Sequence, residues 1–211
     1  MATTISTDSP KLTANIADHA DVYGGRALVF DGVADYLSAS DSSLPSGSSA
    51  RAISFWMKPN SISTAWGTMV SYGTASASQG FNIGWNNTSA NIIVGKYGTN
   101  SSANTTTISM NVWSHIVVVF DGSSTISSYL NGKADGTATL SGINTVLNSL
   151  RIGDAVWANQ YFNGKITDVK IFNTALTEAQ VQELYKKPEN TPNAVQDNLV
   201  AWYPMIEGNP E

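Results

Sequence analysis

Hydrophobic residues along this chain alternate with other residues in short runs. In the segment 53–58, Ile53, Phe55 and Met57 occupy every second position, which predicts a strand with one buried face. Comparable short runs predict further strands at 27–30, 68–72, 81–85, 92–97, 113–120, 126–130, 134–140, 150–153 and 199–205. Asp-Gly or Asn-Gly pairs at 121–122, 131–132 and 135–136 predict tight turns, because these residues tolerate positive φ angles.

The segment 115–120 is apolar at the positions of both faces. A strand that is buried on both faces belongs inside a stack of layers, which favours a sandwich over a single solvated sheet. The length of 211 residues suits one such domain. The predicted fold class is therefore all-β, with two antiparallel sheets and one short helix near the C-terminus.

That helix is predicted within the segment 161–185, which also contains a strand, a turn at Asn163-Gly164 and a second strand. Thr177 and Gln180 have the spacing of a capping box, which marks a helix start. Apolar side chains then recur on one face, and Pro188 stops the helix after Lys187.

Charge and composition narrow the classes of function. The chain has 11 Lys and Arg against 16 Asp and Glu, a net charge of −5, which argues against a nucleic-acid surface. It has no cysteine and therefore no disulfide or thiolate metal site. The N-terminus lacks the pattern of a signal peptide, and no apolar run is long enough to span a bilayer. Residues 1–23 are interpreted as a polar arm that clasps a neighbouring subunit in a homo-oligomer.

Four segments, at 24–37, 53–58, 113–133 and 161–185, carry a family resemblance. In this order they resemble the laminin-G-like, or concanavalin A-like, jelly-roll domains of the lectin/glucanase superfamily, as found in phage and bacterial surface proteins. The resemblance implies a jelly roll over residues 24–211.

The chain departs from the family pattern at its end. The strand 199–205 resembles one that usually comes first in these domains. Either the domain is circularly permuted and 199–205 fills the first-strand position, or the chain stops at the start of a second repeat. We favour the permutation, since a lone trailing strand would leave apolar residues on an open edge.

Catalytic chemistry is not supported by the sequence. Glycoside hydrolysis needs a pair of carboxyl groups, yet the glutamates all lie after position 177, at Glu178, Glu183, Glu189, Glu207 and Glu211. Turn positions account for Asp121 and Asp135. His115 lies in an apolar run and is predicted to be a core histidine. We expect no enzyme, and a glycoside hydrolase is a distant alternative.

The resemblance implies one structural Ca²⁺, held by oxygen ligands. Asp168 stands at the motif position of the ligand, and Asp31 is the second candidate. The alternatives are that Asp168 faces solvent or pairs with Lys165 or Lys170, and that Asp31 only forms its Asp-Gly turn.

Aromatic residues beside polar ones near predicted strand ends have the chemistry of a sugar site. The candidate glycan-binding residues are Trp66, Trp85, Asn86, Tyr97, Asp154, Trp157 and Asn159. The alternative is that these aromatics cap the sandwich or pack on a partner subunit. Trp56, Trp113 and Trp202 are predicted to lie in the core.

The predicted function is a non-catalytic module on a virion or extracellular surface, acting as a decoration or adhesion subunit that binds glycans. Its expected partners are glycans or a virion or cell-surface protein, with no nucleic acid and no membrane. A secreted bacterial carbohydrate-binding module is the alternative.

Overall fold

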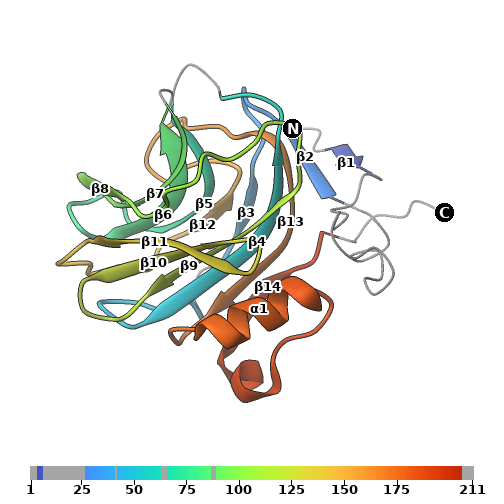
Figure 1. The fold of residues 1–211 in the computed structure, drawn as a ribbon. Helices are drawn as coiled ribbons and strands as arrows, with labels where there is room; N and C mark the ends of the chain where they lie inside the picture. The colour runs from blue at the N-terminus through green and yellow to red at the C-terminus, as the bar shows by residue number, and fades with distance from the viewer. Residues whose placement is uncertain (1–3, 7–26, 41, 63–65, 87–88, 206–211) are drawn as a thin grey trace.

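The computed structural model describes residues 4–6, 27–40, 42–62, 66–86 and 89–205. Two antiparallel sheets lie face to face (Figure 1), which confirms the predicted all-β sandwich. No helix in the described ranges is long and apolar enough to cross a membrane.

The larger sheet has eight described strands. In order across the sheet they are β1 (Thr4–Ser6), β2 (Ala27–Asp31), β13 (Asn163–Phe172), β4 (Arg51–Pro59), β9 (Ser114–Phe120), β10 (Thr125–Leu130) and β11 (Lys133–Thr139), with β14 (Leu199–Tyr203) paired to β13. The smaller sheet has the order β3 (Leu37–Ala39), β12 (Leu150–Ile152), β5 (Gly67–Gly73), β6 (Gly80–Asn86), β7 (Ser89–Lys96) and β8 (Thr99–Ser102).

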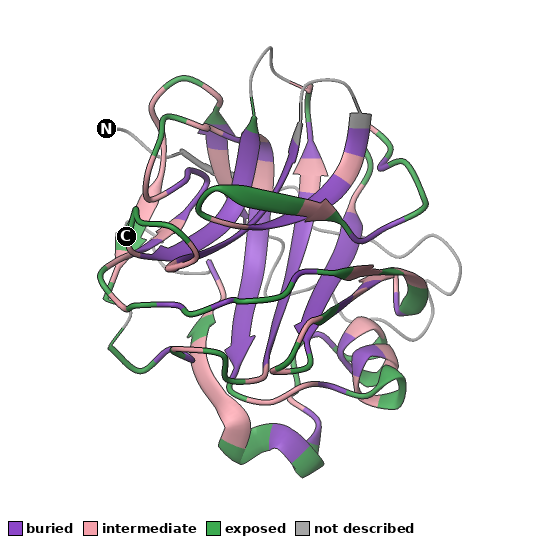
Figure 2. Cartoon of the chain, turned by 90° about the vertical axis from the view of Figure 1, so that its left-hand side faces the viewer, coloured by how far each residue is buried: buried purple, intermediate pink, exposed green. Residues whose placement is uncertain are grey.

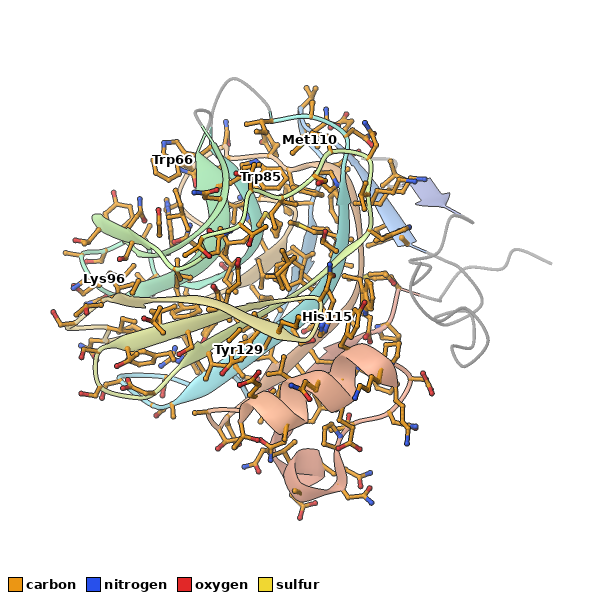
Figure 3. All side chains as sticks on the ribbon, in the orientation of Figure 1. Trp66, Trp85, Lys96, Met110, His115 and Tyr129 are labelled. Atoms are coloured by element: carbon orange, nitrogen blue, oxygen red, sulfur yellow. The ribbon has the colours of Figure 1, made fainter. Side chains whose placement is uncertain are left out.

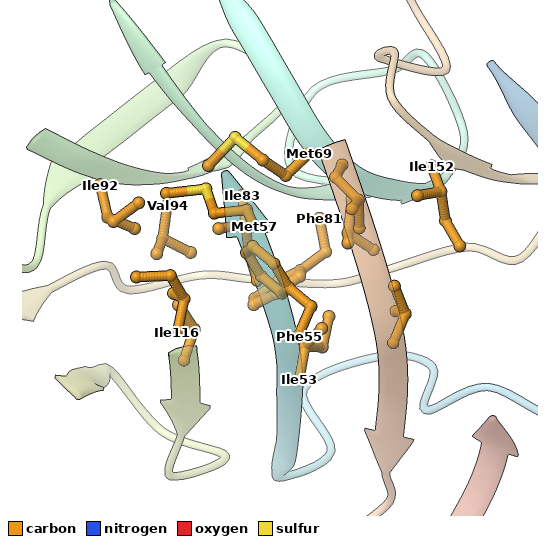
Figure 4. Packing of buried hydrophobic residues seen from close by; sticks show 14 of the residues in the cluster. Ile53, Phe55, Met57, Met69, Phe81, Ile83, Ile92, Val94, Ile116 and Ile152 are labelled. Carbon is orange, nitrogen blue, oxygen red and sulfur yellow. The ribbon is translucent and has the colours of Figure 1, made fainter. Parts of the chain in front are cut away.

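The core fills the space between the two sheets. Ile53, Phe55 and Met57 of β4 point toward Phe81 and Ile83 of β6 (Figure 4), and all five side chains are buried. The predicted period-2 alternation of segment 53–58 is confirmed. Figure 2 shows the same division, with buried residues along the central strands and exposed residues in the connections.

The helix α1 (Glu178–Lys186) covers the outer face of the larger sheet. Its Val181 and Leu184 pack with Val117 and Val119 of β9 in a second apolar cluster. This packing explains the doubly apolar segment 115–120: one face of β9 meets the smaller sheet and the other meets the helix. The predicted capping box forms at the start of α1.

Two predicted turns are wrong. Asn163 and Gly164 are the first two residues of the continuous strand β13, where Gly164 pairs with both Phe30 and Pro59. A Cβ at Gly164 would lie 2.5 Å from the Lys58 carbonyl oxygen, so close backbone approach accounts for this glycine. Asp135-Gly136 lies inside β11, with Asp135 as the extra residue of a β-bulge. The predicted turns at 121–122 and 131–132 do connect β9 to β10 and β10 to β11.

Two strands that are far apart in the sequence, β2 and β14, both pair with β13. Its first half pairs with β2 and its second half with β14, on the same edge. The segment 199–203 therefore packs in this domain, while its place in a permuted jelly roll stays a prediction. A short 3₁₀ segment, η2 (Asn193–Asn198), precedes β14 and was not predicted. Of the predicted arm, Thr4–Ser6 pairs with β2 and the remainder lies outside the described residues.

Candidate functional site

A hollow of about 320 Å³ opens beside the smaller sheet. β6, β7, β8 and the β7–β8 turn contribute to it, together with the residue before β5 and the loop that precedes β13. Trp66 and Lys96 lie on the side of the molecule formed by the smaller sheet (Figure 3). The described residues that line the hollow are Trp66, Asn82, Lys96, Tyr97, Gly98, Asn100, Trp157 and Gln160.

The floor of the hollow is built by strand alternation. Phe81 and Ile83 of β6 point into the core, so Asn82 between them points outward. A Cβ at Gly95 of β7 would overlap the Oδ1 atoms of both Asn82 and Asn100. The absence of a side chain at Gly95 therefore leaves room for two amides side by side.

Asn82 presents an unpaired acceptor to this hollow. The residue is 3% exposed, and no donor in the described part of the chain bonds its Oδ1. A buried polar atom without a partner costs about 1–3 kcal/mol. A ligand hydroxyl that donated to this oxygen would remove that cost.

Aromatic rings form the walls. Trp66 is 36% exposed and Tyr97 is 40% exposed, both high for such large apolar side chains. The rings of Tyr97 and Trp157 meet edge to face with centroids 5.7 Å apart. Trp157 lies over Gly80, where a Cβ would collide with its ring. Rigid aromatic faces beside amides suit a ligand with one apolar face and several hydroxyl groups, which describes a sugar ring.

A buried ion pair holds the loop that carries Trp157 and Gln160. The Asp154 Oδ2 atom lies 2.7 Å from Arg151 Nη1, and the Gln160 backbone N–H donates to Asp154 Oδ1 at 2.8 Å. Arg151 Nη1 also donates to the Ala155 carbonyl, and its guanidinium stacks 4.4 Å from the Tyr36 ring centroid. Burial raises the pKa of Asp154, against the hydrogen bonds that lower it. The carboxylate is fully buried, so the predicted glycan contact at Asp154 is replaced by a positioning role.

The hollow brings together Trp66, Tyr97 and Trp157 among the predicted glycan residues. The prediction for Trp85 is wrong: it is 1% exposed and packs in the core against Phe162, with ring centroids 5.3 Å apart. Its place on the inward face follows from the alternation with Phe81 and Ile83, which the sequence already showed. Asn159 is exposed but is not among the described lining residues. Asn86 ends β6, and its side chain lies outside the described part.

Sequence reasoning missed the polar lining residues Asn82, Lys96, Asn100 and Gln160. One signal was present for Asn82: a polar residue alternates with core residues and stands between Gly80 and Gly84. No local pattern marked the others.

The predicted metal ligands do not form one site. Asp31 of β2 pairs with Asn163 of β13, and Asp168 lies five residues further along β13. At the usual rise per residue of a strand, the Cα atoms of Asp31 and Asp168 are about 16 Å apart. The Asp31 carboxylate accepts hydrogen bonds from the Val33 and Ala34 backbones, and these bonds lower its pKa. No three His, Asp or Glu side chains gather as metal ligands in the described ranges.

Asp168 is buried in an ion pair instead. Lys170 Nζ lies 2.5 Å from its Oδ1 atom, and the Trp202 indole donates to the same oxygen at 2.8 Å. A calcium ion at Asp168 would have to displace the ammonium group. This pairing is one of the alternatives that the sequence left open. Trp202 is 41% exposed, so its predicted place in the core is wrong.

His115 is a core residue, as its apolar context predicted. It is 1% exposed, its Nε2 atom lies 2.8 Å from Ser54 Oγ, and its ring packs against Trp56 and Tyr185. Burial, aided by the positive charge of Lys170, lowers the pKa of His115 to about 3. Because Ser54 and His115 are both buried, a substrate cannot reach the Ser54 hydroxyl.

Comparisons with known proteins place this geometry in a family. A sequence model described as "Concanavalin A-like lectin/glucanases superfamily" matches residues 31–182. No curated protein matches the chain at a significant level.

Solved structures share the fold at low sequence identity. Domain 4 of AbnA, a GH43 extracellular arabinanase from Geobacillus stearothermophilus in complex with arabinotriose, is 22% identical, with a TM-score of 0.61 over 87% of each chain. A heptameric SAP-like pentraxin from Limulus polyphemus is 17% identical, with a TM-score of 0.60 over 83% of this chain and 89% of that chain. A putative carbohydrate binding protein from Bacteroides ovatus is 17% identical, with a TM-score of 0.62 over 84% of this chain and 50% of that chain.

Proposed function

Because the chain belongs to the concanavalin A-like lectin/glucanases superfamily, we propose that it is a non-catalytic carbohydrate-binding module. The hollow beside the smaller sheet is its binding site. The observation that carries this proposal is the buried, unpaired Asn82 Oδ1 atom, because Asn82 lines the same hollow as the exposed rings of Trp66 and Tyr97.

The dimensions and chemistry of the hollow support a sugar ligand. Its volume of about 320 Å³ lies at the lower end of the range for small-molecule sites. Aromatic rings contact the apolar face of a sugar, while amides bond its hydroxyl groups. The arabinotriose complex of the arabinanase domain and the carbohydrate-binding description of the Bacteroides ovatus protein support the same ligand class.

The lining argues against hydrolysis at this site. Glycoside hydrolysis requires two carboxyl groups on either side of the scissile bond. The described lining residues include no Asp or Glu, and the nearby Asp154 is buried and paired with Arg151. The site therefore has the means to hold a sugar and lacks the acid and base that cleavage needs.

A glycan array followed by calorimetry tests the proposal. Wild-type protein should bind at least one glycan, and Trp157→Ala or Asn82→Ala should weaken that binding roughly tenfold or more. Val112→Ala is the matched control, because Val112 is 52% exposed and is not among the described lining residues. Silence of the wild-type protein across the array would overturn the proposal.

The proposed setting is a virion or extracellular surface, where the domain acts as a decoration or adhesion subunit. A low charged fraction of 13% and the extracellular arabinanase among the structural neighbours support this setting. Mass spectrometry of purified particles and of the culture medium tests it. Recovery from the cytosolic fraction alone would contradict it.

A further inference from the structure

The hollow contains one cationic side chain and no acidic one among its described lining residues. Lys96 supplies the cation from the end of β7. The other polar groups of the floor are the neutral amides of Asn82 and Asn100. On the basis of the proposed function, we propose that the bound sugar unit carries an anionic substituent, a carboxylate or a sulfate, that contacts Lys96 Nζ.

The ammonium group of Lys96 makes two hydrogen bonds within the protein and has one further N–H donor. Its Nζ atom donates to Ser78 Oγ at 3.0 Å and to the Gly142 carbonyl at 3.3 Å. An ammonium group has three donors, so two are used and one remains. Because two bonds already fix the nitrogen, an arriving anion meets a donor whose conformational freedom is reduced.

No described carboxylate neutralises this charge. Two short ion pairs join described residues, Arg151 with Asp154 and Lys170 with Asp168, and neither includes Lys96. Asp154 belongs to the same loop as Trp157, yet it is fully buried and points to Arg151. The charge of Lys96 therefore has no counter-ion among the described carboxylates.

The amides complement an anionic ligand. A protein carboxylate in place of these amides would accept hydrogen bonds from sugar hydroxyls more strongly. It would also repel an anionic ligand in so small a space. Asn82 accepts a hydroxyl without that repulsion. The net charge of −5 opposes anion binding over long distances, but physiological salt screens exposed charges beyond about 8 Å. The local cation decides the preference.

The experiment compares ligands that share a sugar ring and differ in one anionic substituent. Titration calorimetry is run with a glucuronate-containing oligosaccharide, its neutral glucose counterpart, and a sulfated form of the neutral one. Wild-type protein should prefer at least one anionic form by about fivefold, and that preference should shrink as salt rises. The two anionic arms identify which substituent the site accepts.

Variants assign the preference to Lys96. Lys96→Met should reduce the affinity for the anionic form to that for the neutral form, and Lys96→Arg should retain the preference. Lys133→Met is the matched control, because Lys133 is an exposed lysine of β11 on the larger sheet. Thermal melts of each variant check that it is folded.

The possible failures are distinct. Binding of the neutral glycan as tight as that of both anionic forms would overturn this inference and leave the proposed function standing. The same holds if the anionic preference survives in Lys96→Met. Silence toward every glycan would overturn the proposed function itself and this inference with it.

Discussion

Lys170 Nζ lies 2.5 Å and 2.7 Å from the two carboxylate oxygens of Asp168, two residues before it on β13. Both side chains are at most 2% exposed. Lys170 Nζ also donates to the Pro188 carbonyl at 2.6 Å, and Trp202 of β14 donates to Asp168. The pair thus ties β13 to the end of the helix region and to the last strand. Asp168 has a φ of +53°, at a bulge in the pairing with β4, which orients its carboxylate.

Asp168→Asn should lower the free energy of unfolding by about 3–5 kcal/mol, because it leaves a buried ammonium group without its counter-ion. Asparagine tolerates positive φ, so the loss reports the charge. Urea denaturation should give the same loss with calcium and with a chelator. Asp197→Asn, at an exposed position, should change stability by about 0.5 kcal/mol or less. A loss that appeared only with calcium present would instead support a metal at Asp168.

The buried His115 should make the protein less stable in acid. Its folded-state pKa of about 3 lies below the ordinary histidine pKa of 6.5, so the unfolded chain binds a proton first as the pH falls. The contribution of the neutral His115 to the free energy of unfolding is complete above pH 6.5 and declines as the pH falls toward 3. Each pKa unit is worth about 1.4 kcal/mol, which amounts to about 3 kcal/mol at pH 4.5.

The measurement is urea denaturation at pH 7 and at pH 4.5 for the wild type and His115→Gln. The carboxylates titrate in both proteins. The difference between the two proteins in how much the free energy of unfolding changes with pH therefore reports the contribution of His115. Equal pH dependence in the two proteins would show that His115 does not carry this effect.

Gly95→Ala should fill the floor of the proposed sugar site. Its Cβ would overlap the amide oxygens of Asn82 and Asn100. Both amides would therefore have to leave the positions in which they are proposed to contact a ligand. We expect roughly tenfold weaker glycan binding with a change in melting temperature of only a few degrees, since side chains rather than backbone must shift. Calorimetry and thermal melting together check this. Unchanged affinity would place the ligand elsewhere on the protein.

Asp154→Asn should loosen the loop that carries Trp157. The substitution keeps the shape but removes the charge that pairs with Arg151, so we expect a loss of about 1–3 kcal/mol in stability and weaker glycan binding. Limited proteolysis should then cut the loop 154–160 faster than in the wild type. Arg151→Met should produce the same two effects. Loss of stability with unchanged affinity and unchanged cleavage would contradict the positioning role.

Several features could be predicted because they depend on neighbouring residues. Period-2 alternation in segment 53–58 predicted β4, and the Thr177–Gln180 spacing predicted the start of α1; both depend on residues close in sequence. The turn predicted at Asn163-Gly164 was wrong because the same dipeptide also serves where two strands approach closely, as at Gly164. The identity of two neighbouring residues does not predict how closely another strand approaches them.

The sequence by itself determined the all-β class, the family, the capped helix and the supply of aromatic residues beside polar ones. Tertiary structure alone decided that Trp66, Tyr97 and Trp157 share one hollow while Trp85 enters the core. It also decided that Asp168 meets Lys170 and Trp202. The physical reason is that strand pairing and bulges set which distant side chains meet, whereas the local pattern sets only the face on which each residue lies.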